Sequence, residues 1–331
     1  MRVQWLSAAG LGLLVGAALA EPSPPGPRTG GAMTCTRTLS PSDDLRDAIG
    51  SLPEGGTLCL LPGTYGAPIR VEQAATLRAT GPGVILDAGR RGPVFGTSAM
   101  EGTILLEGLV LQGGVAGEAG GAVQVEGMAT VVLRGCTLRD NRGGSYGGGA
   151  IRTNDGDLHI ESCRLEGNVA ERGGAALLAD GTARVRVEGS LITGNDAGRG
   201  AVVRASDGAR VALVGTTLAG NAGAAALAVD GTASRAPELV VSGCIVDHGA
   251  GPVMHGDPQP PRPALRFEAS VLRGRPPLLD TAAGNVVGDP ELGDDHRPSA
   301  TSPARGLWTH PSGADLHGAA RPTPATAGAL E

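Results

Sequence analysis

Short segments with alternating apolar and polar residues recur along the middle of the chain. They begin at residues 131, 158, 185 and 211, so successive copies are offset by 27, 27 and 26 residues. Within a copy every second residue is apolar, as Val131 and Leu133 are in the first, and the residues between are mostly polar or small. This period of two predicts that each copy opens with a β-strand that buries one face.

Each copy continues beyond this first strand. A Gly or Ser interrupts the alternation, a second short strand follows, and a third apolar patch comes after a Gly-rich turn, as at 149–151. Such short strands cannot bury their apolar faces alone, but each can pair in register with the same strand one repeat later, at about 4.8 Å. Weaker copies occur near 76–86, 104–114, 239–249 and 265–272. The pattern predicts an all-β solenoid with coils of about 26–28 residues.

An asparagine ends the second strand of the four strongest copies: Asn141, Asn168, Asn195 and Asn221. An Asn side chain at a turn can point inward and bond neighbouring backbone groups and the next Asn of the stack. We interpret the four as an internal structural ladder. The alternative is a row of amides that binds a ligand.

Asp-Gly dipeptides recur at 155–156, 180–181, 207–208 and 230–231, just before the next strand. Asp-Gly favours a turn because Gly accepts positive φ and Asp bonds the turn backbone. Four carboxylates on one edge could instead bind Ca²⁺, but their spacings are looser than those of the apolar columns, and no dense acidic repeat is present. The sequence therefore predicts turns here, with neither a metal site nor a cofactor.

The N-terminal segment is typical of an exported protein. Arg2 precedes an apolar run, and an A-x-A-type site ends at Ala20, which predicts a signal peptide over 1–20. The run is too short to span a bilayer, and no later segment is apolar enough to do so. Residues 21–34 are rich in Pro and Gly and are typical of a flexible spacer.

The first ordered elements are expected directly after this spacer. Apolar spacing predicts a short helix near 43–52, with Ser42 as its cap. A strand at 57–61 and a turn at 62–65 follow.

Composition agrees with a thin solenoid core. Aromatic residues make up 2% of the 331 residues, while there are 56 Gly, so a conventional aromatic-rich core is not expected. The net charge of −6 gives no reason to expect a nucleic-acid partner.

Two recurring motifs carry a resemblance. L-x-x-N (138–141, 165–168, 218–221, and 192–195 with Ile first) and G-G-A (148–150 and 173–175) resemble the paired repeats of polymorphic outer-membrane proteins, with Leu or Ile in place of Phe. The repeats as a whole look like the right-handed parallel β-helix proteins of the pectin-lyase-like superfamily. This resemblance implies a right-handed parallel β-helix with a short N-terminal cap helix over 35–283.

The C-terminal region has a resemblance of its own. Its elements are Gly284-Asn285, Asp289-Pro290, Ser302-Pro303-Ala304, Arg321-Pro322 and Gly328-Ala329. They resemble the closing region of secreted bacterial β-helix proteins that carry a choice-of-anchor domain. This implies a C-terminal cap or tail over 284–331.

Five cysteines remain after the predicted signal, so at least one has no partner within the chain. Cys35 and Cys59 bracket the cap helix that the resemblance implies, and we expect a disulfide between them. Cys136 and Cys163 fall in one inward column with Cys244. Parallel stacking is poor disulfide geometry, so we favour buried free thiols, with a Cys136–Cys163 bond as the alternative.

Candidate chemistry is confined to the outward residues of the first strands. Glu161 and Glu188 should stand one coil apart, with His159 and Arg186 in the adjacent column. Two carboxylates at this separation could serve a glycosidase or lyase. The alternative is a solvated ladder of mixed charge, which exposed sheet faces favour.

No recognisable catalytic signature accompanies this cluster. We therefore interpret the chain as a non-catalytic protein that is secreted, periplasmic or on the cell surface, and that presents a surface to a polysaccharide, an envelope component or a protein. The alternative is a diverged polysaccharide lyase or hydrolase acting on acidic glycans.

Overall fold

The computed structural model describes residues 34–231, 235–255, 264–274, 276, 283–308, 315–317, 321, 323 and 325–330. Contacts divide the chain into Met1–Thr34 and Cys35–Glu331, and the description below concerns the second unit. The predicted signal peptide and nearly all of the predicted spacer lie outside the described residues.

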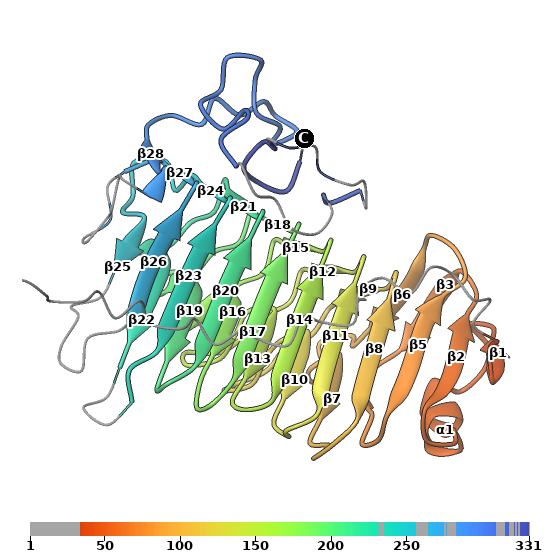
Figure 1. Cartoon of the computed structure of the whole chain (residues 1–331). Helices are drawn as coiled ribbons and strands as arrows, with labels where there is room; N and C mark the ends of the chain where they lie inside the picture. The colour runs from red at the N-terminus through yellow and green to blue at the C-terminus, as the bar shows by residue number, and fades with distance from the viewer. Residues whose placement is uncertain are drawn as a thin grey trace, which may run out of the picture. The chain divides into compact units, whose positions relative to one another are not determined.

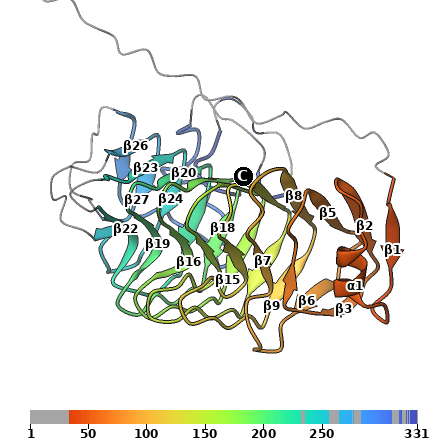
Figure 2. The same ribbon diagram turned by 90° about the horizontal axis from the view of Figure 1, so that it is seen from below.

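Three parallel sheets make up the described strands, and from β2 to β25 each coil of the chain contributes one strand to each sheet in turn. Strands that hold the same place in successive coils lie side by side in both views (Figures 1 and 2). Sheet A comprises β1 (Arg37–Leu39), β2 (Gly56–Leu60), β5 (Ala75–Ala79), β8 (Thr103–Glu107), β11 (Thr130–Arg134), β14 (Asp157–Glu161), β17 (Arg184–Glu188), β20 (Arg210–Val214), β23 (Glu238–Ser242) and β26 (Ala264–Glu268).

The other two sheets complete each coil. Sheet B comprises β3 (Gly63–Gly66), β6 (Val84–Asp87), β9 (Val110–Gln112), β12 (Thr137–Arg139), β15 (Arg164–Glu166), β18 (Leu191–Thr193), β21 (Thr217–Ala219), β24 (Ile245–Val246), β27 (Val271–Leu272) and β28 (Val286–Val287). Sheet C comprises β4 (Ile69–Arg70), β7 (Phe95–Thr97), β10 (Val123–Val125), β13 (Ile151–Thr153), β16 (Gly174–Ala179), β19 (Ala201–Ser206), β22 (Ala225–Asp230) and β25 (Met254–His255).

The register of sheet A confirms the predicted columns. Val131 pairs with Leu158, which pairs with Val185, and all three are buried. Like apolar side chains therefore stack above one another in a single core that runs through the coils. The predicted solenoid of parallel β-coils is confirmed, including the weak copies at both ends.

A short helix and a disulfide close the N-terminal end. The helix α1 (Leu45–Gly50) buries Leu45 and Ala48, and Ile49 packs partly buried against the core. Its cap is not Ser42 as expected. Asp44 accepts hydrogen bonds from the N–H groups of the first turn, because it stands directly before the helix, whereas Ser42 bonds Ser40.

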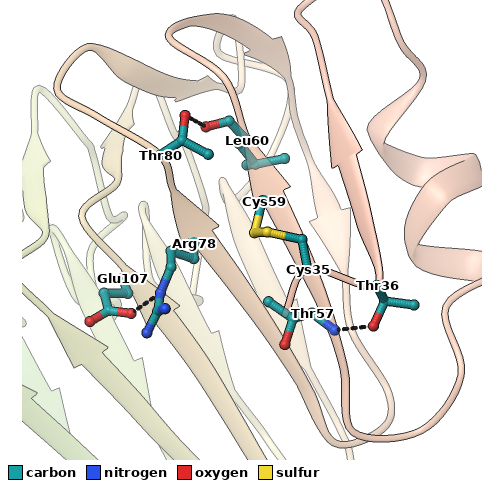
Figure 3. The surroundings of a disulfide bond; sticks show 8 residues. All are labelled: Cys35, Thr36, Thr57, Cys59, Leu60, Arg78, Thr80 and Glu107. Atoms are coloured by element: carbon teal, nitrogen blue, oxygen red, sulfur yellow. Dashed lines mark hydrogen bonds and ion pairs between the residues drawn. A yellow bond between two sulfur atoms is a disulfide. The ribbon is translucent and has the colours of Figure 1, made fainter. Parts of the chain in front are cut away.

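The predicted Cys35–Cys59 disulfide is confirmed, with Cα atoms 5.7 Å apart (Figure 3). It ties the residues before β1 to β2, the next strand of the same sheet.

The prediction of a turn at 62–65 is wrong. Residues Gly63–Gly66 form β3 and pair with β6, because stacking supplies partners that local sequence does not reveal. Tyr65 points into the core, and its hydroxyl donates to the carbonyl oxygens of Leu39 and Leu61.

The C-terminal arm, defined as the described residues of 289–330, folds back against coils that precede it. Figure 1 shows it, in blue, beside the ends of β18, β21 and β24. Trp308 packs against outward-facing Val214, and Leu316 packs against Leu191. Further along the stack, Ser162 Oγ donates to the carbonyl oxygen of Asp315 at 3.0 Å. The predicted domain boundary at 283/284 stays a prediction, and β28 lies just beyond it.

Candidate functional site

The four ladder asparagines use their amide groups inside the stack. Asn168 Nδ2 donates to Leu138 O and to Asn195 Oδ1, each at 2.9 Å. Its Oδ1 accepts from the backbone N–H of Asn141 at 3.2 Å and from the Asn141 amide at 3.0 Å. The same pattern continues through Asn195 and Asn221. These hydrogen bonds support the structural interpretation and leave the amides with no group to offer a ligand.

A second internal ladder occupies the corner between sheets A and B. Cys136, Cys163 and Cys244 are buried free thiols, as expected. Side chains in this column also accept hydrogen bonds from backbone N–H groups. Cys163 Sγ accepts one from Cys136 N at 3.3 Å, and Ser190 Oγ accepts one from Cys163 N at 3.0 Å. Burial raises the pKa of Cys163 well above its usual range and that of Cys244 to about 12. Neither thiol is poised as a nucleophile.

The predicted charged cluster is brought together on the outer face of sheet A. His159 stands beside Arg186 in the next coil, and Glu161 beside Glu188. Arg134 Nε donates to Glu161 Oε2, and Arg186 Nε donates to Glu188 Oε2, each at 2.8 Å. Each carboxylate is thus held by a guanidinium group in a charge-assisted hydrogen bond.

The same outward column becomes apolar where the C-terminal arm covers it. Glu161 and Glu188 are followed by Val214, which contacts Trp308. The arm therefore covers the outer face of sheet A at Val214, one coil beyond Glu188, whereas Arg266 further along that face is exposed.

A hollow that the sequence analysis missed lies on the outer face of sheet C. It has a volume of about 270 Å³ and is lined by Tyr146, Arg152, Gly173, Leu178, Asp180, Arg204, Ser206, Asp207, Asp230 and Gly231. An adjoining hollow of about 420 Å³ shares Asp180 and Asp207 with it and adds Asn154, Asp155, Gly181 and Arg235. We call the two together the sheet C groove.

The recurring Asp-Gly turns supply the acidic wall of this groove. Gly181 has φ +63°, and Asp180 Oδ1 accepts the Gly181 N–H at 2.8 Å, so the turn interpretation is confirmed there. The opposing arginines occupy outward positions of the third strands, where Arg152, Leu178 and Arg204 are neighbours in successive coils. Because these arginines stand at outward positions of the third strands, the repeat pattern could have identified them as surface residues of sheet C.

Among the described residues, no group of three or more His, Cys, Asp or Glu is placed to hold a metal ion. That same part of the chain contains no helix that is long and apolar enough to cross a membrane.

Comparison with known proteins agrees with this architecture. A family described as "Right handed beta helix region" matches residues 98–254. The solved structure of pectate lyase Pel9A is similar with a TM-score of 0.51 and 14% identity, over 91% of this chain and 97% of that one. Alginate lyase from Paenibacillus sp. str. FPU-7 gives a TM-score of 0.37 and 14% identity, over 71% of this chain and 99% of that one. No curated protein matches the sequence significantly.

The chain is thus a right-handed parallel β-helix with the pectin-lyase-like fold, as its repeats indicated. At 14% identity, the likeness to pectate lyase concerns the fold alone.

Proposed function

We propose that this protein is exported and works without catalysis, by presenting the outer surface of its β-helix to a glycan, an envelope component or another protein. The observation that carries the proposal is that both carboxylates of the predicted charged cluster are ion-paired. Glu161 and Glu188 are each hydrogen-bonded to an arginine at 2.8 Å. A pair of carboxylates that divides acid and base roles needs two different environments, and here both are ion-paired surface groups.

Export is supported by the Cys35–Cys59 disulfide, since such bonds persist in oxidising compartments. Fractionation of producing cells, with N-terminal sequencing of the recovered protein, tests this part. We expect an N-terminus at Glu21 in the periplasmic or extracellular fraction. Recovery of uncleaved protein from the cytoplasm would contradict it.

The second candidate is a diverged lyase or hydrolase of acidic polysaccharides. It is favoured by the fold shared with pectate lyase Pel9A along 91% of this chain. The deciding experiment incubates the purified protein with pectate and with alginate, and follows unsaturated product and new reducing ends. We expect neither product. Turnover that the double substitution Glu161→Gln, Glu188→Gln abolishes would establish the enzyme instead.

A further inference from the structure

We propose that the sheet C groove binds a short segment of a neutral, hydroxyl-rich glycan. This inference rests on the proposed function, because it names the ligand class and the face through which surface contact would occur. It concerns a different sheet from the charged cluster of His159 and Glu161.

The floor and sides of the groove are built by four successive coils, which contribute β13, β16, β19 and β22. Leu178 forms an apolar floor between Arg152 and Arg204. Since neighbouring coils are about 4.8 Å apart, the two arginines stand about 10 Å apart along the stack. A volume of about 270 Å³ is close to the lower end of small-molecule sites. The adjoining hollow extends this space, so the groove suits a ligand of several linked units.

Both arginines are fixed across the face of the sheet. Arg204 Nη1 donates to the carbonyl oxygen of Arg172 at 2.7 Å, and its Nε lies 2.8 Å from Asp230 Oδ2. Arg152 donates to the carbonyl oxygen of Glu118 and lies 3.7 Å from Asp180. The groove therefore presents donors and acceptors in preset positions, which lowers the entropic cost of binding.

The charge of the lining favours a neutral ligand. The two hollows are lined by three Arg and four Asp, a formal charge of −1. A polyuronate would have to displace the aspartates that already pair with Arg152 and Arg204. A sugar hydroxyl, which is both donor and acceptor, can bond either member of each pair.

Tyr146 supplies the apolar surface that such a ligand needs. It lines the groove and is 59% exposed, whereas the other described aromatic residues, Tyr65, Phe95, Phe267 and Trp308, are buried. A Tyr ring offers a rigid, amphipathic surface at little cost in conformational entropy. The apolar face of a pyranose ring can lie against it while the hydroxyls reach the arginine–aspartate pairs.

The test is calorimetric titration of the purified protein with cellohexaose, mannohexaose, xylohexaose and hexagalacturonate. We expect at least one of the three neutral hexasaccharides to bind, and to bind more tightly than hexagalacturonate. Tyr146→Ala should weaken this binding at least about tenfold. The matched control is Met128→Ala, which removes another exposed apolar side chain outside both hollows and should change affinity by less than about twofold.

Two results would overturn the inference. One is the absence of binding by all three neutral hexasaccharides. The other is neutral binding that Tyr146→Ala leaves unchanged, which would move the site elsewhere while leaving the proposed surface-contact function intact. Cleavage of pectate or alginate would count against the proposed function alone, because the Tyr146→Ala titration still reports on the groove. Thermal melting of each variant shows that the stack is folded.

Discussion

The contact between the C-terminal arm and the β-helix can be broken by a single methyl group. Gly243 lies in the turn between β23 and β24 with φ +59°, and a Cβ there would come within 2.3 Å of the Trp308 ring. Gly243→Ala should therefore push Trp308 out of its place. Gly135 is the matched control, because it occupies the same turn of an earlier coil with φ +58°, and its Cβ would meet nothing within 4 Å.

The two substitutions share one cost and differ in another. Each places an L-residue in the left-handed region, at about 1–2 kcal/mol. Only Gly243→Ala also displaces Trp308, which is 5% exposed and has the Arg321 guanidinium 5.3 Å from its ring centroid. Removing a buried Trp side chain costs about 3–5 kcal/mol in cores, so we expect Gly243→Ala to lose about 3 kcal/mol more than Gly135→Ala.

The assay is fluorescence. Trp308 and Trp5 are the two tryptophans of the chain, and Trp5 lies in the predicted signal peptide, so the processed protein would report on Trp308 alone. Gly243→Ala should red-shift the emission and raise acrylamide quenching, while Gly135→Ala should leave both unchanged. Equal stability and equal quenching in the two variants would refute the reasoning.

Three further predictions concern the interior and its charges. Asn168→Ala leaves the Leu138 carbonyl and one backbone N–H without partners, at a cost of about 1–3 kcal/mol each. Urea denaturation should therefore show that the free energy of unfolding falls by about 2–6 kcal/mol, against less than about 0.5 kcal/mol for the outward-facing control Glu166→Ala. Equal losses in the two variants would count against the ladder. Because Cys136, Cys163 and Cys244 are all buried, Ellman's reagent at about pH 8 should detect no thiol in the native protein and three in denaturant; rapid native labelling would disprove this. Hydrogen bonds from the Gln112 amide and a turn N–H lower the pKa of Asp87, so its stabilisation is complete above the unfolded pKa of about 3.9 and is lost as pH falls through the lower folded value. Asp87→Asn should flatten the acid side of the melting profile, and an unchanged profile would be inconsistent with this assignment.

The core of the β-helix was predictable because its determinants repeat. Val131 and Leu158 hold equivalent places in a period of two and a period of 27, so their contact follows from the pattern alone. The same logic placed Glu161 beside Glu188. It did not place their arginine partners, since Arg134 donates to the next coil while Arg186 donates within its own strand.

The C-terminal arm and the sheet C groove depend on contacts that do not repeat from coil to coil, so the sequence period does not predict them. Ser162 and Asp315 are 153 residues apart in sequence. A partial signal existed, because the outward position of sheet B turns apolar at Leu191, Ile245 and Val271, where the arm lies. In the groove, Leu178 separates Arg152 from Arg204, so the third strands show no column of like residues.

The corner ladder of Cys136, Cys163, Ser190, Thr216, Cys244 and Ser270 relaxes the usual rules of substitution. Four of these places hold a small inward side chain whose sulfur or oxygen accepts an N–H from the preceding coil, as Ser270 Oγ does from Cys244 N at 3.1 Å. Serine, threonine and cysteine are then interchangeable in this column, whereas alanine, which has no acceptor atom in its side chain, is not. Replacing these three cysteines with serine should therefore give a protein with the same stack and no free thiol. Its only cysteines would be Cys35 and Cys59, which form the disulfide.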